Sequence, residues 1–322
     1  MRKICALFLA ALMVISVVGG CKKDSEYIAG TEKYTTDNQT EESTTEESTT
    51  KEPETEEPTT EEPTTEEPTT ETPTVPVVPE LPASGLSTES INFSYGIGSN
   101  EQVPAASYNA QLHFNDLAKY GIQAVSYDSK TTEKVLYLTF DCGYEYNGNT
   151  VKILDVLKEK NVKGTFFVLY TFASKNPVTV QRMIDEGHIV GSHSSYHKKF
   201  PEITKDEMIF ELTTVADFIK NNYNYDMEYF RFPSGTYSDD TMQFVASQGY
   251  KIAFWSCTHR DFDVENQPDP KEALDTLLSR IHPGAVILLH SLSDTNAQIL
   301  GQFIDEAIAR GYTFKNLDEL NW

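Results

Sequence analysis

The stretch Val135-Leu136-Tyr137-Leu138-Thr139-Phe140-Asp141-Cys142-Gly143 decides the fold class of this 322-residue chain. Its apolar run at 135–140 predicts a buried β-strand that delivers an acid, Asp141, to the strand's carboxyl end. In α/β folds, catalytic residues gather at that end. About fifty residues later the chain carries His193-Ser194-Ser195-Tyr196-His197, whose two histidines, four apart, can share one helical face. Together the two stretches indicate a hydrolytic metal site.

The rest of the folded part repeats this strand-then-helix pattern, which predicts a parallel sheet, either open and doubly wound or closed as a barrel. We expect strands at residues 135–140, 164–169, 188–192, 229–232, 251–255, 285–289 and 312–315. We expect helices at residues 150–160, 177–186, 205–221, 239–248, 270–280 and 297–310. Typical helix starts are Asn176-Pro177 and the capping pair Thr204 and Glu207, and typical stops are Gly187, Gly249 and Gly311.

Polar residues follow several of the predicted strands: Asp141, His193, Arg231, Ser256 and His290. The carboxyl ends of parallel strands share one edge of the sheet, so we expect these side chains to lie close together. Each has a structural alternative when taken alone. Asp141 can cap a turn, the histidine spacing can be incidental, and His290 can be a core residue. Their clustering favours an enzyme.

Residues 1–20 have the pattern of a bacterial lipoprotein signal. Arg2 and Lys3 precede an apolar run at 4–18, which is shorter than the about 20 residues that span a bilayer, and small residues stand before Cys21. Resemblance to such signals implies cleavage before Cys21, lipidation of its sulfur and an extracytoplasmic protein held on the cell membrane. An ordinary secretion signal with an incidental cysteine is the alternative.

Residues 21–84 are rich in Glu, Thr and Pro, and Glu-Glu-Pro-Thr-Thr repeats from Glu56 onward. Residues 22–80 hold 18 acidic residues and 4 lysines, a net charge of −14 out of −23 for the whole chain. Such a segment has too little apolar surface for a core, so we predict a disordered tether. The acidic balance argues against nucleic acid as a partner, because phosphates require a basic surface.

Five stretches resemble the motifs of polysaccharide deacetylases of the NodB-homology group, the family-four carbohydrate esterases. They are Thr139-Phe140-Asp141-Cys142-Gly143-Tyr144-Glu145, His193-Ser194-Ser195-Tyr196-His197, Arg231-Phe232-Pro233-Ser234-Gly235, the stretch 255–261, and Leu288-Leu289-His290. The resemblance implies a distorted (β/α) barrel at 131–322, with residues 85–130 as its N-terminal extension. The stretches 280–285 and 311–318 most resemble muramic-acid de-N-acetylases that make spore-cortex δ-lactam.

The resemblance also implies an activity, the hydrolysis of N-acetyl groups on amino sugars of a cell-wall polysaccharide. Asp141 is expected to be the general base, oriented by Arg231. His290 is expected to be the general acid, tuned by Asp261. These roles suit the chemistry, since an amide requires an activated water and a proton for its leaving nitrogen.

Three further expectations concern the metal and the oxyanion. His193 and His197 are expected to hold a divalent metal, zinc first, with cobalt, nickel or manganese as alternatives. A backbone N–H near Ser234 and Gly235 is expected to meet the oxyanion. Cys142 stands where most of the family has a second aspartate that binds the metal. A thiolate there would be a soft ligand that favours zinc, whereas a protonated buried thiol would leave a two-histidine site.

Three alternatives remain open from the sequence. The substrate can instead be N-acetylglucosamine in peptidoglycan, a chitin-like polymer or an exopolysaccharide. The chain can also be a non-catalytic, carbohydrate-binding descendant of such an enzyme, although retention of the expected acid and base favours catalysis. Finally, Cys142 and Cys257 both follow predicted strands, so a disulfide between them is conceivable.

Overall fold

The computed structural model of the chain describes residues 85–93 and 103–322. The predicted signal at 1–20, the predicted lipidation site Cys21 and the predicted tether at 21–84 lie outside the described residues. The described residues belong to one compact unit. In these two ranges, no helix combines the length and the apolar character needed to cross a membrane.

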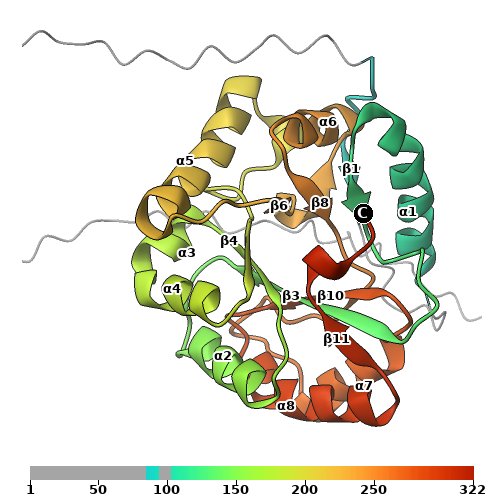
Figure 1. The fold of residues 1–322 in the computed structure, drawn as a ribbon, viewed down its shortest axis with the longest axis vertical. Helices are drawn as coiled ribbons and strands as arrows, with labels where there is room; N and C mark the ends of the chain where they lie inside the picture. The colour runs from blue at the N-terminus through green and yellow to red at the C-terminus, as the bar shows by residue number, and fades with distance from the viewer. Residues whose placement is uncertain (1–84, 94–102) are drawn as a thin grey trace, which may run out of the picture. The chain divides into compact units, whose positions relative to one another are not determined.

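The central element is a parallel sheet of nine strands (Figure 1). Eight of them follow the order β2-β8-β6-β5-β4-β3-β10-β9, and β11 pairs with the first residues of β3. An isolated bridge between Tyr127 and Ala285 joins the segment after β2 to β10, near the opposite edge of the sheet. The strands are β2 (Ala124–Val125), β3 (Val135–Cys142), β4 (Thr165–Val168), β5 (Ile189–Ser192), β6 (Tyr229–Phe230), β8 (Lys251–Ala253), β9 (Cys257–Thr258), β10 (Ala285–His290) and β11 (Thr313–Lys315). The expected α/β class, a distorted barrel of parallel strands, is confirmed.

Helices connect the strands and surround the sheet (Figure 1). Each strand and helix expected from the sequence is present, with ends displaced by three residues at most. Thr204 and Glu207 form the expected capping box, and the three expected glycine stops all have positive φ. The helices are α1 (Ala105–Leu117), α2 (Asn149–Glu159), α3 (Tyr170–Lys175), α4 (Pro177–Asp185), α5 (Lys205–Tyr223), α6 (Asp239–Ser247), α7 (Pro270–Arg280) and α8 (Asp294–Ala309).

The described residues of the region 85–130, namely 85–93 and 103–130, pack with the barrel and add elements that the sequence pattern did not indicate. β1 (Ile91–Asn92) pairs antiparallel with β7 (Thr236–Tyr237), and β2 pairs with β8. Helix α1 buries polar residues: Ser107 donates to the Trp255 carbonyl at 3.1 Å, and Gln111 accepts from the Ser126 N–H at 2.8 Å. Because these buried positions are polar, the apolar periodicity that indicates a helix is weak in α1.

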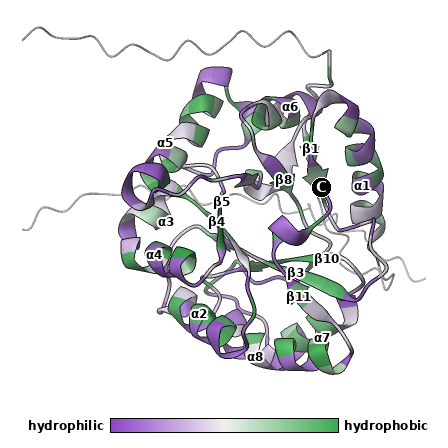
Figure 2. Ribbon diagram, in the orientation of Figure 1, coloured by the Kyte–Doolittle hydropathy of each residue, from purple (hydrophilic) through white to green (hydrophobic). Residues whose placement is uncertain are grey.

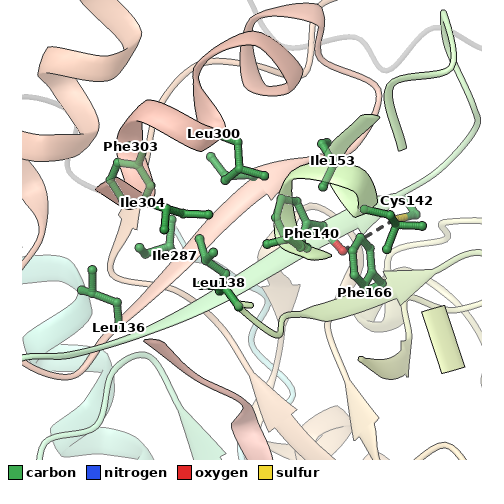
Figure 3. Packing of buried hydrophobic residues seen from close by; sticks show 14 of the residues in the cluster. Leu136, Leu138, Phe140, Cys142, Ile153, Phe166, Ile287, Leu300, Phe303 and Ile304 are labelled. Carbon is green, nitrogen blue, oxygen red and sulfur yellow. Dashed lines mark hydrogen bonds between the residues drawn. The ribbon is translucent and has the colours of Figure 1, made fainter. Parts of the chain in front are cut away.

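The two faces of β3 belong to different cores. Leu136, Leu138, Phe140 and Cys142 pack outward against the helices, as Figure 3 shows, whereas Val135 and Tyr137 pack into the barrel. Strands β3 and β10 are also coloured as hydrophobic in Figure 2. Since successive side chains of a strand point to opposite faces, Asp141 continues the inward row and Cys142 the outward row.

Candidate active site

Asp141 is held at the end of β3 by a buried guanidinium. The Arg231 side chain donates to Oδ1 of Asp141 at 2.9 Å, and two further N–H groups of Arg231 donate to the carbonyls of Ala253 and Phe254, both at 3.0 Å. Its guanidinium carbon lies 4.2 Å from the Phe167 ring centroid. Burial favours the neutral acid, but the charge of Arg231 and the neighbouring His193 outweigh it and lower the pKa of Asp141. Asp141 is therefore a carboxylate at neutral pH.

His290 lies beside Asp141 on the neighbouring strand. The two residues are register partners in the parallel pair β3 and β10, which places both side chains on the same face of the sheet. Nδ1 of His290 is 2.7 Å from Oδ1 of Asp261, so Nε2 is the nitrogen left for a substrate. The Asp261 side chain is fully buried, whereas that of His290 is 23% exposed. Burial opposes protonation of His290, but the Asp261 charge outweighs it and raises the pKa of His290.

The two histidines of the second motif come together on a loop rather than on the expected helical face. His193 and His197 follow β5, with ring centroids 5.0 Å apart. Ser194 and His197 both have positive φ, at 70° and 61°, so the chain turns sharply between the rings. The side chain of Glu211 in α5 accepts hydrogen bonds from the N–H groups of Ser195 and Tyr196, at 3.0 and 2.7 Å. Helix α5 thus holds this loop in its strained conformation.

Cys142 is not part of this cluster. Its side chain is fully buried in the outer core beside Phe140 and Phe166 (Figure 3), and its Sγ lies 3.8 Å from the Phe140 carbonyl oxygen. Burial raises the pKa of the Cys142 thiol, so it stays protonated at neutral pH. The doubtful prediction of Cys142 as a metal ligand is therefore not supported. Cys142 and Cys257 are both free and lie on strands separated by β10, so the conceivable disulfide is absent.

The donors that remain fit a divalent metal as a two-histidine site. Nδ1 of His193 is 2.9 Å from the Arg231 carbonyl, an acceptor, so Nδ1 carries the proton and Nε2 keeps a free lone pair. His193 is buried, which lowers its pKa and keeps the imidazole neutral, the form that binds metals. Within residues 85–93 and 103–322, no group of three or more His, Cys, Asp or Glu residues is arranged to hold a metal ion.

Replacing Cys142 with alanine tests this reading of the site. We expect the dissociation constant for Zn²⁺ to change by less than about twofold, because a protonated thiol facing the core does not contribute a ligand. His197→Ala should weaken binding by at least about tenfold in the same isothermal titration. A loss of affinity in Cys142→Ala as large as in His197→Ala would show that the thiol reaches the metal.

The third motif places its two small residues differently. Ser234 is exposed at the surface with φ of 55°, whereas Gly235 is buried. The Gly235 N–H donates to the Phe232 carbonyl at 2.9 Å, so it does not serve as the expected oxyanion donor. A Cβ at Gly235 would lie 2.9 Å from the Trp255 ring, so this glycine has a packing role. Ser234 remains the candidate for oxyanion contact in this turn.

Ser256 does not lie with the other residues expected at the strand ends. In addition, three polar residues that support the site were not predicted from the sequence. The Ser256 hydroxyl is hydrogen-bonded to Nε2 of His282 at 2.8 Å. The Ser256 N–H donates to the carbonyl of Val286, near the start of β10. The missed residues are Glu211, His259 and Asn296. Glu211 accepts from the Ser195 N–H, Asn296 donates to Asp261, and His259 is hydrogen-bonded to Asn296. Glu211 and Asn296 lie on helices outside the quoted motifs, so residue type alone gave no signal. His259 lies inside the fourth stretch, 255–261, where a histidine before an acid could have been noticed.

Comparison with known proteins agrees with the fold. A family model described as polysaccharide deacetylase matches residues 128–253. The solved structure of Bacillus subtilis PdaA, a family-four carbohydrate esterase, superimposes with a TM-score of 0.66 at 37% sequence identity, over 73% of this chain and 98% of that one. The chain belongs to the polysaccharide deacetylase family and is an enzyme of this class.

Two curated relatives extend the comparison. The chain is 39% identical to the peptidoglycan-N-acetylmuramic acid deacetylase PdaA of Bacillus subtilis, over 74% of this chain and 88% of the relative. It is 27% identical to a peptidoglycan-N-acetylglucosamine deacetylase of Bacillus cereus, over 68% of this chain and 78% of the relative. The family resemblance noted in the sequence is thereby confirmed.

Proposed function

We propose that this chain is a metal-dependent peptidoglycan N-deacetylase that acts on N-acetylmuramic acid. The observation that carries the proposal is the pairing of Asp141 with His290 in register on β3 and β10, each backed by a buried ion partner. This pairing sets a base and an acid at adjacent points of one sheet edge. The identity to PdaA supports muramic acid as the sugar, in preference to glucosamine.

The side chains divide the reaction between them. The Asp141 carboxylate takes a proton from the attacking water, whose oxygen forms a bond to the acetyl carbonyl carbon. The C–N bond then breaks, and the imidazolium of His290 gives its Nε2 proton to the leaving nitrogen. Arg231 keeps Asp141 in place, and Asp261 favours the protonated form of His290. A divalent metal on His193 and His197, when bound, supplies Lewis-acid polarisation of the acetyl carbonyl.

Acetate release from peptidoglycan is the direct test. We expect the purified chain lacking residues 1–20, supplied with a divalent metal, to release acetate, and mass spectrometry of the digested product to place the lost acetyl group on muramic acid. Loss from glucosamine would select the alternative substrate. Absence of release with zinc, cobalt, nickel and manganese would favour the carbohydrate-binding descendant.

We further propose that the protein works outside the cytoplasm on a lipid anchor at Cys21. The support is the signal-like sequence before this cysteine. We expect the predicted tether after it, about 60 residues, to span about 45 Å if it is a flexible coil, which would let the enzyme reach nearby wall polymer. We expect Cys21→Ala to move the protein from the membrane fraction to the soluble or unprocessed fraction. Unchanged fractionation and processing in this variant would refute the anchor.

A further inference from the structure

Asn296 is a buried polar residue in the first turn of α8. It contacts both His290 and Asp261, which are called the acid pair below. Its Nδ2 group donates to Oδ2 of Asp261 at 2.6 Å and to the carbonyl of His290 at 3.1 Å. Its backbone N–H donates to Ser293, the N-cap of the helix, at 3.1 Å. The Asn296 side chain is therefore fixed at its root by the helix and at its tip by the acid pair.

The orientation of this amide is determined by its partners. Asp261 and the His290 carbonyl only accept hydrogen bonds, so the NH₂ group must face them and Oδ1 must face the other way. Nε2 of His259 lies 2.7 Å from Oδ1 and must therefore carry a proton and donate it. Nδ1 of His259 is buried and has no hydrogen-bond partner among the described residues. The hydrogen bond to Asn296 therefore explains why a histidine, rather than an apolar residue, occupies position 259.

The Asp261 carboxylate depends on this support. Oδ1 accepts from Nδ1 of His290, while Oδ2 accepts from the His290 N–H at 2.7 Å and from Asn296. Loss of the Asn296 bond would leave the carboxylate held by His290 alone, so the carboxylate and the imidazole would lose their tie to α8 and shift together. A small misplacement of a reacting group can cost about a hundredfold in rate.

We propose that Asn296 is a positioning residue for the general acid. It holds His290 through Asp261, and His259 fixes the amide of Asn296 in the required orientation. This inference rests on the proposed function only for its kinetic readout, since the geometry itself is independent of the substrate.

The kinetic test is a double-mutant cycle. Asn296→Ala is expected to lower kcat for acetate release by about ten- to a hundredfold with KM within about twofold. In the Asp261→Asn background, the same change should cost less than about threefold, because Asn296 acts through the Asp261 carboxylate. Equal losses in both backgrounds, or an effect on KM alone, would overturn the proposal. His259→Phe offers a second route to the same site and should give a smaller kcat loss that is not additive with Asn296→Ala.

A matched control separates positioning from structure. Asn149 is also fully buried and donates to the Leu292 carbonyl at 2.9 Å and to Asp294 at 2.8 Å, beside the same end of α8, without touching the acid pair. Asn149→Ala should therefore lower the melting temperature but leave kcat within about twofold. A kcat loss in Asn149→Ala equal to that in Asn296→Ala would assign both effects to disturbance of α8.

An NMR measurement distinguishes failure of this inference from failure of the proposed function. The Nδ1 proton of His290, assigned by its loss in His290→Ala, should shift and exchange faster in Asn296→Ala but not in Asn149→Ala. An unchanged signal in Asn296→Ala would refute the positioning role whether or not the parent releases acetate. If the parent protein releases no acetate but the signal still changes in Asn296→Ala, the positioning role is supported. Only the proposed deacetylase reaction is then contradicted.

Discussion

Asp141→Asn is expected to lower turnover by about two to four orders of magnitude, the contribution of a positioned general base. Asparagine keeps the shape of the side chain and an oxygen that can accept from Arg231, but it cannot take a proton from water. The variant should be assayed by acetate release, with saturating substrate so that the loss appears in kcat.

Folding must be followed in the same variant, because Asp141 and Arg231 form a buried ion pair. Removing one member of such a pair costs at most about 3–5 kcal/mol, and the two carbonyl partners of Arg231 will reduce this cost. We expect a lower melting temperature with an unchanged circular dichroism spectrum at 25 °C. Asp128→Asn is the matched control: Asp128 is a buried acid bonded to Tyr137 and lies outside the site. Near-parental turnover in Asp141→Asn would contradict its role as the base.

His290→Ala is expected to cause the second large loss, again about two to four orders of magnitude in kcat, because the leaving nitrogen would lack a proton donor. His113→Ala is a suitable control. His113 also pairs with an acid, Asp239, at 2.7 Å, but this partly buried pair joins α1 to α6 away from the site. The kcat of His113→Ala should stay within about twofold of the parent value. A large loss in His290→Ala alone would then come from the missing general acid and not from the loss of a histidine–aspartate pair.

The pH profile checks the same assignment. A general acid must be protonated, so the rate should fall as pH rises through the pKa of His290. The Asp261 charge raises that pKa, which moves the fall to higher pH than for an unpaired histidine. Asp261→Asn removes the charge, lowers the pKa of His290 and should move the fall to lower pH. A shift in the opposite direction would show that the titrating group acts as a base.

Much of the fold followed from the sequence because its elements carry strong local signals. Most of β3 is an apolar run and α5 begins with a capping box, so local sequence alone predicts both elements. Helix α1 is not predicted by the sequence pattern, because its buried Ser107 and Gln111 are polar. Both are stabilised by hydrogen bonds to distant segments, which no local pattern reveals.

Cys142 shows how a motif can mislead where periodicity would not. The resemblance set Cys142 at a ligand position, yet the two-residue period of a strand already separates it from Asp141. With β3 extended through Cys142, the thiol faces the outer core and the carboxylate faces the barrel. Strand β3 extends two residues beyond the predicted strand at 135–140, and the protonated-thiol alternative is the one that fits this extension.

The sequence by itself determined the α/β class, the order of the strands along the chain and four of the five residues expected at one sheet edge, all except Ser256, because periodicity and the right-handed β–α connection are local rules. Only the tertiary structure decided which groups hold those residues in place. Glu211 reaches the histidine loop from α5, and Asn296 reaches Asp261 from α8, 35 positions along the chain. Such contacts depend on how separate helices pack around the barrel, and that packing is a property of the whole chain.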